Sequence, residues 1–370
     1  MTFVVLSGAD LKQLLRGLRP CDVESLAEVL GQALVQYSCR DERQYQPERC
    51  VVTRPGGQVS LFMPATTEQS IGVKIVGIRP SLDPTSVSPD EKLMPALQSA
   101  LTICDTLGHA VGILNAAELT AFRTALGSIL LYRYRHATEN IVVFGAGKQA
   151  LWHIRLAVLL RGHNIRRITV VNRSSQRTQD LVDSLRESGL PSHISLEAFG
   201  GQESAANLLE ELLVSADVIF CTTPSTRPLF PAAFLMSENA RAKTRFISAI
   251  GSYRPDMAEI DPELLRTVVN PTGLLSDQVW NGRIAVDSRD GCLQEAGELI
   301  AGGISANQII EVGQIENSRM GSESRGMKQW LESGLVFYKS VGIGIMDMAV
   351  GSKLMQLAQS KGIGTHLESF

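Results

Sequence analysis

Three small residues, Gly145, Gly147 and Ala150, follow the G-x-G-x-x-A pattern directly after an apolar run at residues 141–144. Gly145 permits a tight turn, and Gly147 lets the backbone approach a pyrophosphate. The helical pattern that begins there offers unpaired N–H groups and the positive end of a helix dipole. A second apolar run follows at residues 168–171. Because strand, turn, helix and strand come in the required order, we interpret the stretch as a dinucleotide-binding unit rather than a packing turn.

The residues after the second run indicate which dinucleotide is bound. An acidic residue there would bind the ribose 2′-hydroxyl of NAD, whereas this chain has Asn172, Arg173, Ser174 and Arg177. Guanidinium groups bind phosphate bidentately, which suits a 2′-phosphate. The alternative is an exposed basic turn without a ligand. We therefore predict NADPH as the cofactor, with NADH less favoured.

The first 116 residues have the pattern of an α+β unit with an antiparallel sheet. Ser7 and Asp10 form a capping pair for a first helix that reaches residue 18, and a second helix is expected at residues 23–37. The remaining features are short β-rich runs at residues 50–53, 59–63, 71–76, 101–104 and 111–114, a Pro-Gly-Gly turn at residues 55–57 and a loop at residues 80–92.

A helix expected at residues 117–134 joins this unit to the nucleotide unit. Buried strands are expected at residues 218–221 and 246–250, and shorter ones at residues 268–269 and 284–286. Polar residues follow the first two of these strands. Because ligands of parallel sheets bind at the carboxyl ends of the strands, we expect these polar residues to lie at the ligand site. Ser340 is expected to cap a last helix that packs on the first domain.

Composition limits the class of protein. The 370 residues predict two domains, and a net charge of −3 argues against a nucleic-acid partner. Six cysteines without C-x-x-C spacing and six histidines without an H-x-x-x-H pair predict neither a disulfide framework nor a metal site. No apolar run reaches membrane-spanning length, so we expect a cytoplasmic enzyme with no membrane partner.

Seven motifs in order resemble the ornithine cyclodeaminase and mu-crystallin family over nearly the whole chain. They are M-P-A at residues 63–65, G-V-K at 72–74, E-L-T-A-x-R-T-A at 118–125, G-A-G-x-Q-A at 145–150, T-T-P-S from 222, A-I-G at 249–251 and K-S-V-G at 339–342. The resemblance implies an α/β fold, with a Rossmann-type NAD(P)-binding domain and a discontinuous α+β domain whose antiparallel sheet forms a homodimer. We assign residues 1–122 and 330–370 to the substrate-binding and dimerisation domain, and residues 123–329 to the Rossmann domain.

In the family, three cations hold the substrate carboxylate, and the matching positions are Arg49, Lys74 and Arg123. Fixed cations suit an imino or amino acid whose Cα must face the nicotinamide. Lys74 and Arg123 are the expected catalytic residues, and Lys74, or a water it orders, is the candidate proton donor. Each cation also has a structural alternative, such as an exposed edge-strand arginine for Arg49 or an outward-facing lysine for Lys74.

The motifs also assign the cofactor site. The expected cofactor-binding residues are Thr124, Gly145, Ala146, Gly147, Gln149, Asn172, Arg173, Ser174, Arg177, Thr222, Thr223, Pro224, Ser225, Ser340, Val341 and Gly342. Ser252 and Tyr253 are expected to line the substrate pocket near the nicotinamide.

The main departure from the cyclodeaminase pattern is at Tyr253. Cyclodeaminases have an Asp there that works on the substrate amino groups, and a phenol with a pKa of about 10 is a poor base at neutral pH. Mu-crystallin-like members, which resemble ketimine reductases, also lack the Asp and share an R-P-D run like residues 254–256. Asp256, beyond a proline, is not expected to substitute.

We therefore predict an NADPH-dependent reductase of an imino acid, such as a pyrroline- or piperideine-2-carboxylate. One alternative is an ornithine cyclodeaminase-like enzyme or an amino-acid or opine-type dehydrogenase. The other is a non-catalytic protein that holds a small ligand on an NADPH-bound fold.

Overall fold

The computed structural model describes residues 2–79, 97–200, 206–318 and 325–368. It divides into two compact units: Met1–Arg123 with Gly344–Phe370, and Thr124–Ile343. The boundary expected at residue 330 was too early, because β14 (Val336–Lys339) pairs in parallel with β11 (Phe246–Ala249) inside the second unit. The loop expected at residues 80–92 lies outside the described residues.

The first unit is built on one mixed sheet. Over the described residues its strand order is β15-β1-β6-β5-β4-β3-β2. The strands are β1 (Phe3–Leu6), β2 (Cys50–Thr53), β3 (Val59–Thr67), β4 (Ser70–Ile78), β5 (Leu97–Asp105), β6 (Ala110–Asn115) and β15 (Thr365–Leu367). Among the described strands of this sheet, only β1 and β6 form a parallel pair. The five predicted β-runs correspond to β2 through β6, whereas β1 and β15 were missed.

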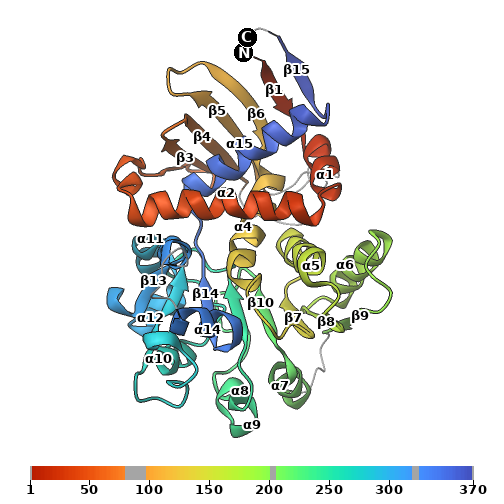
Figure 1. The fold of residues 1–370 in the computed structure, drawn as a ribbon, viewed down its shortest axis with the longest axis vertical. Helices are drawn as coiled ribbons and strands as arrows, with labels where there is room; N and C mark the ends of the chain where they lie inside the picture. The colour runs from red at the N-terminus through yellow and green to blue at the C-terminus, as the bar shows by residue number, and fades with distance from the viewer. Residues whose placement is uncertain (1, 80–96, 201–205, 319–324, 369–370) are drawn as a thin grey trace. The chain divides into compact units, whose positions relative to one another are not determined.

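Helices cover one face of this sheet. They are α1 (Gly8–Arg16), α2 (Pro20–Cys39) and α15 (Gly344–Ser360). The start of α1 confirms the predicted capping pair: the Asp10 N–H donates to the Ser7 hydroxyl oxygen, and the Ser7 N–H donates to the Asp10 carboxylate. The α15 helix packs on β3, β4 and β5, and α2 packs on α15 (Figure 1). Segments from the two ends of the chain therefore share one core.

Strand alternation separates the two faces of the sheet. On β4, Lys74 and Val76 are buried on the α15 side, while Ile71 and Ile75 point the other way and are exposed. Phe62 of β3 pairs with Ile75 and is exposed as well. Within the described residues, no helix of the first unit covers this apolar side of the sheet, which we call the uncovered face.

The second unit is a parallel sheet with the order β13-β12-β14-β11-β10-β7-β8-β9 over the described residues. Its remaining strands are β7 (Asn140–Phe144), β8 (Arg167–Val171), β9 (Ser195–Phe199), β10 (Val218–Cys221), β12 (Ile284–Val286) and β13 (Ile309–Glu311). Its helices are α5 (Lys148–Arg161), α6 (Ser175–Glu187), α7 (Ala206–Ser215), α8 (Ala233–Met236), α9 (Glu238–Arg241), α10 (Pro262–Val269), α11 (Arg289–Glu295), α12 (Gly297–Gly302), α13 (Val312–Ser318) and α14 (Arg325–Ser333). The strand order reverses between β7 and β10, which confirms the Rossmann-type fold and defines its ligand-binding crevice.

Helices pack against both faces of this sheet. Inward side chains of one face form a core with α7, α8, α10 and α12. On the other face, Phe220 and Phe246 contact Tyr132 of α4 (Ala116–Tyr132), and Phe220 also contacts His153 of α5. The strand expected at residues 268–269 was wrong: these valines end α10, where they bury one face of an amphipathic helix.

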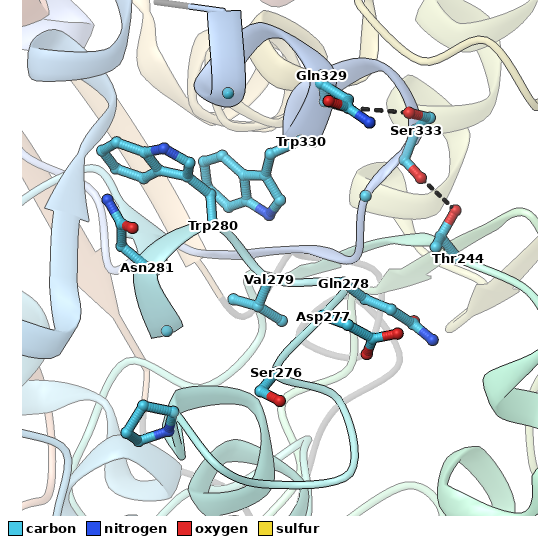
Figure 2. A pocket seen from close by; sticks show the side chains of 14 residues that line it. Thr244, Ser276, Asp277, Gln278, Val279, Trp280, Asn281, Gln329, Trp330 and Ser333 are labelled. Carbon is cyan, nitrogen blue, oxygen red and sulfur yellow. Dashed lines mark hydrogen bonds between the residues drawn. The ribbon is translucent and has the colours of Figure 1, made fainter.

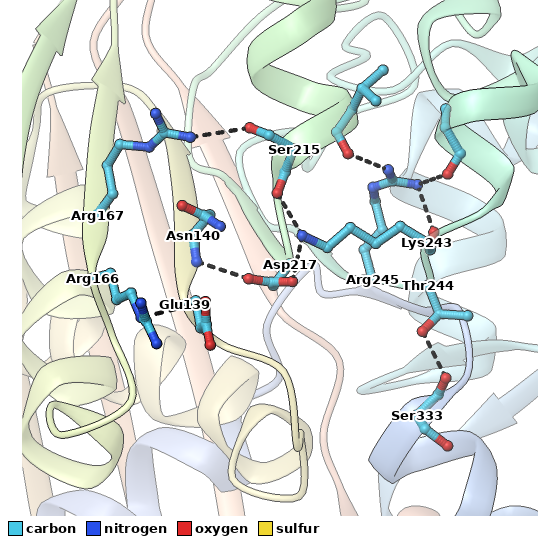
Figure 3. Close-up of polar contacts among 12 residues, drawn as sticks. Glu139, Asn140, Arg166, Arg167, Ser215, Asp217, Lys243, Thr244, Arg245 and Ser333 are labelled. Carbon is cyan, nitrogen blue, oxygen red and sulfur yellow. Dashed lines mark hydrogen bonds and ion pairs between the residues drawn. The ribbon is translucent and has the colours of Figure 1, made fainter.

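Polar contacts hold the amino ends of the strands together. The Asp217 carboxylate, just before β10, accepts the Asn140 N–H and pairs with Lys243 at 2.7 Å (Figure 3). Buried Arg245 donates to carbonyls at the ends of α7 and α9, including that of Val214. Because these hydrogen bonds and the ion pair tie the strand ends to neighbouring helices, they have a structural role.

Candidate active site

Two of the predicted substrate cations meet around one carboxylate in the first unit. The Lys74 ammonium lies 2.5 Å from Asp347 Oδ2, and the Arg123 Nε lies 3.0 Å from Oδ1. All three residues are almost completely buried. A buried charge cluster of this kind is stable only with close pairing, so Asp347 is the counter-charge that permits both cations.

Three different elements bring these groups together. Lys74 is on the covered face of β4, Arg123 is in α4, and Asp347 is in the first turn of α15. The positive end of the α15 dipole further favours a carboxylate at that position. Residues far apart in sequence thus converge through the crossing of α15 over the sheet.

The electrostatics of the cluster favour a proton donor. Burial lowers the pKa of Lys74 to about 8, with Arg123 and Arg49 adding to the shift and Asp347 opposing it. Burial would raise the pKa of Asp347, but Arg123 and Lys74 together keep it below its ordinary value. Lys74 is therefore a stronger acid than a free lysine, and Asp347 stays ionised at neutral pH.

Arg49 completes the set of predicted cations. It directly precedes β2 and is more exposed than the other two. Its positive charge makes a small further contribution to the lowered pKa of Lys74. Lys74 and Arg123 together outnumber the Asp347 carboxylate, so the net positive charge of the cluster suits an anionic substrate group.

The predicted glycine turn lies where the strand order reverses. Gly145 follows β7 with φ of 111°, and a Cβ there would lie 2.7 Å from the Thr222 hydroxyl oxygen at the end of β10. A Cβ on Gly147, the N-cap of α5, would have no neighbour within 4 Å. Gln149 in the first turn of α5 has a buried side-chain oxygen without a hydrogen-bond partner in the described chain. Backbone crowding at Gly145 beside open space at Gly147 fits a pyrophosphate-binding turn, because the N–H groups at the start of α5 can donate to phosphate oxygens.

A cavity of about 610 Å³ opens at the carboxyl ends of β7, β8 and β10. Predicted cofactor residues from two segments line it, namely Asn172 and Arg173 after β8 and residues 223–225 after β10. Ser174 and Arg177 lie beside it, with the Arg177 N–H donating to the Ser174 hydroxyl oxygen at the N-cap of α6. Their side chains do not line the cavity in the described chain.

Buried acids fix the loops at this edge. Glu259 accepts the Thr223 and Gly251 N–H groups, at 2.7 and 2.5 Å, and burial raises its pKa to about 7. Asp287 accepts the Ser340 hydroxyl and the Gly342 N–H. The Thr222 hydroxyl instead donates to the Phe144 carbonyl. The loops after β10, β11 and β14 are thus held in place by hydrogen bonds to buried carboxylates, and this pre-organises the edge of the sheet for a ligand.

Two predicted roles need correction. Ser340 does not cap the last helix, because its hydroxyl donates to Asp287 and α15 begins only at Gly344. Ser252 does not expose its side chain to a pocket: it is fully buried, donates to Glu298 and accepts from Lys339 at 2.6 Å.

Tyr253, next in the chain after the buried Ser252, has 47% of its surface exposed. Asp256 pairs with Arg254 on the surface. Val341 is half-buried beside Asp287, which accepts its N–H, and Thr124 is buried in α4. These positions leave Tyr253 available to a ligand while Asp256 is engaged elsewhere.

Sequence reasoning missed Asp347, Arg227 and the buried acids Glu259, Asp287 and Glu298. Asp347 had one available signal, an acidic residue in an otherwise apolar stretch of the last helix. Arg227 follows the T-T-P-S motif by two residues and lines the same cavity as Arg173. The other acids carry no spacing signal, because their partners are backbone N–H groups and a lysine from distant segments.

A second cavity, of about 650 Å³, lies at the opposite edge of the parallel sheet (Figure 2). Trp280 and Trp330 stack along one side of it, with ring centroids 5.9 Å apart. Thr244 and Gly334, which precede β11 and β14, also line it. It is thus separate from the edge that carries the glycine turn.

In the described part of the chain no helix has the length and apolarity needed to cross a membrane.

Comparison with known proteins gives the family. The sequence profile of the ornithine cyclodeaminase/mu-crystallin family matches residues 20–361. The chain belongs to this family. Ketimine reductase mu-crystallin of Macropus fuliginosus is 24% identical over 343 residues, covering 91% of this chain and 93% of the relative.

Solved structures have the same fold. Thermococcus litoralis Δ1-pyrroline-2-carboxylate reductase, in complex with NADH and L-proline, has a TM-score of 0.73 at 20% identity and covers 99% of this chain and 100% of its own. An archaeal alanine dehydrogenase dimer with bound NAD has a TM-score of 0.72 at 18% identity and covers both chains fully. Family membership and the dinucleotide edge identify the chain as an oxidoreductase that acts at a C=N or CH–NH bond with a nicotinamide cofactor.

Proposed function

We propose that the chain reduces a cyclic 2-imino acid, such as a pyrroline- or piperideine-2-carboxylate, to the amino acid with NADPH. The observation that carries this proposal is the buried Lys74–Asp347–Arg123 cluster with Arg49 acting on it. Its net positive charge suits a carboxylate, and its lysine is acidic enough to donate a proton near neutral pH. Reduction of an imine that carries a carboxylate requires both a cation to bind the carboxylate and a proton donor for the nitrogen.

Each residue has a distinct part in this proposal. Arg49 and Arg123 bind the substrate carboxylate and so fix the imine carbon. Lys74, directly or through a water, supplies the proton that the ring nitrogen takes up. When bound, the dinucleotide supplies the hydride for the imine carbon. Asp347 keeps Lys74 and Arg123 in place but faces inward, so it is a positioning residue.

NADPH is favoured over NADH by the cavity that Arg173 lines. Guanidinium groups pair well with a 2′-phosphate, while NAD-binding sites use an acid at this point. Gly145 and Gly147 would hold the pyrophosphate at the start of α5. We assign cofactor binding to the second unit, and substrate binding and dimerisation to the first.

The uncovered sheet face supports a homodimer. Val52, Phe62, Ile71 and Ile75 expose between 37% and 42% of their surface on that face. Contiguous exposed apolar side chains usually mark an interface, and the occupant we propose is a second copy, as in the archaeal alanine dehydrogenase dimer. None of the six cysteines, all of which lie in the described part of the chain, forms a disulfide, which fits the cytoplasmic location that we propose.

Ornithine cyclodeamination has less support. It needs a base where Tyr253 stands, and the nearest carboxylate along the chain, Asp256, is paired with Arg254 on the surface. A dehydrogenase or opine-type reaction, or a binding role without turnover, would still use the same cations.

The test follows NADPH oxidation with five- and six-membered cyclic 2-imino acids, beside a reaction of L-ornithine and NAD assayed for ammonia. We expect oxidation of NADPH with one of the two ring sizes, and no ammonia from the reaction of L-ornithine and NAD. Lys74→Met should lose most of this activity, and Lys328→Met, which removes an exposed lysine, should keep it. Ammonia release without net cofactor consumption would replace the proposal with cyclodeamination, and full activity of Lys74→Met would remove Lys74 from the chemistry.

A further inference from the structure

Two arginine residues line the cavity at the carboxyl ends of β7, β8 and β10. Arg173 follows β8, and Arg227 lies on the loop after β10. No acidic residue lines this cavity in the part of the chain that the structure describes, and neither arginine forms an ion pair there. Two arginines on the wall of one cavity, without an acidic residue beside them in the described chain, suit a dianion.

The rest of the wall suits a nucleoside. Phe199, Leu209 and Leu229 supply apolar surface, and Asn172 supplies a side-chain amide. A volume of about 610 Å³ is in the range of small-molecule sites. A planar base can pack on the apolar wall while a phosphate on its ribose meets the guanidinium groups.

Hydrogen bonds hold the backbone of the loop that carries Arg227. The Ser225 hydroxyl donates to the Arg227 carbonyl and accepts the Arg227 N–H, at 2.5 and 3.2 Å. The Ser225 carbonyl accepts the Ala258 N–H at 2.9 Å. Because these hydrogen bonds hold the backbone of Arg227, the entropy cost of binding a ligand comes mainly from ordering its side chain.

We infer that Arg227 is a second 2′-phosphate ligand, which forms with Arg173 a two-arginine clamp on the adenosine 2′-phosphate half of NADPH. This inference rests on the NADPH preference proposed above and extends it to a residue outside the dinucleotide motif. A 2′-phosphate carries nearly two negative charges at pH 7, so one guanidinium leaves it incompletely paired. Arg227 supplies the second charge from the neighbouring strand.

The experiment measures dissociation constants of NADPH, NADH, 2′,5′-ADP and 5′-AMP for the full chain by calorimetry, without substrate. The variants are Arg227→Gln, Arg173→Gln and their combination. Arg16→Gln, which removes an exposed arginine of α1, is the matched control. We expect Arg227→Gln to weaken NADPH and 2′,5′-ADP about tenfold each, since a hydrogen bond to a charged group is lost. NADH and 5′-AMP should change less than about twofold, which also shows that the site remains folded.

Several outcomes would overturn the inference. Equal weakening of NADPH and NADH would place Arg227 on another part of the dinucleotide, and unchanged NADPH affinity would remove it from the site. If Arg173→Gln abolishes the preference for NADPH while Arg227→Gln leaves it unchanged, this inference fails and the proposed cofactor stands. If the unmodified chain binds NADH more tightly than NADPH, the cofactor proposal fails as well.

Discussion

Replacing Asp347 with Asn tests the charge cluster most directly. The amide has nearly the shape of the carboxylate, so packing changes little while the only negative charge of the buried trio disappears. In the wild-type chain two cations share one anion, at 2.5 and 3.0 Å. Asp347→Asn leaves the Lys74 ammonium and the Arg123 guanidinium buried against each other without a counter-charge.

The expected loss of stability is large. Removing one partner of a buried ion pair costs about 3–5 kcal/mol, because the remaining charge stays desolvated. For a domain of this size that corresponds to a fall in Tm of roughly 6–20 °C for the first unit. Loss of an exposed salt bridge would lower the free energy of unfolding by less than about 1 kcal/mol, so the measurement distinguishes a buried ion pair from an exposed one.

The same substitution should change the pH dependence of turnover. Asp347 opposes the effect of burial on Lys74, whose pKa is about 8. Without the carboxylate the pKa should fall further, by roughly 1–3 pH units. If protonated Lys74 is required, the alkaline limb of the rate profile moves to lower pH by that amount.

The assay combines chemical unfolding followed by circular dichroism with pH profiles of kcat/KM. Lys74→Met and the double variant with Asp347→Asn complete a cycle. The double variant should recover part of the stability, since it removes one of the two unpaired cations. The counter-charge role is refuted if the free energy of unfolding of Asp347→Asn lies within about 1 kcal/mol of the wild-type value. It is also refuted if the double variant is no more stable than Asp347→Asn.

Four further results are expected. The wild-type kcat/KM for imine should fall as pH rises through about 8, where Lys74 loses its proton, and a flat profile to pH 10 would exclude Lys74 as the donor. Arg173→Asp should weaken NADPH far more than NADH; an unchanged ratio of dissociation constants would contradict the 2′-phosphate assignment. Gly145→Ala should lower the free energy of unfolding by about 1–3 kcal/mol, because Gly145 has a positive φ and a Cβ there would meet Thr222. Gly147→Ala should fold normally and bind the dinucleotide more weakly. Equal stability of the two variants would contradict this assignment. Ile75→Asp should give monomers by light scattering, and a retained dimer would move the interface away from the uncovered face.

The sequence predicted most of the architecture because its signals are local. The glycine motif, the capping pair at Ser7 and the apolar runs of β2 to β8 depend on near neighbours or on strand periodicity. The missed strands are short or lie on an edge. The valines 268–269 were misassigned because two β-branched residues do not distinguish a strand from the end of a buried helix.

The site was harder to predict than the fold. Lys74 and Arg123 were found through family motifs, but their shared carboxylate lies more than 220 residues away along the chain from either. Ser252 was misassigned because its position beside a predicted ligand edge does not reveal that Lys339 and Glu298 surround it. Long-range pairing of charges leaves no periodic trace in a single sequence.

The order of segments along the chain has a consequence for biosynthesis. The α15 helix fills the core of the first unit and carries Asp347, yet it follows the whole second unit in sequence. During translation, the nucleotide-binding unit can therefore complete its fold while β3, β4 and β5 still lack the helix that covers them. Over that interval the nascent chain holds Lys74 and Arg123 without their counter-charge, and truncated products should be captured by chaperones far more than the full-length chain.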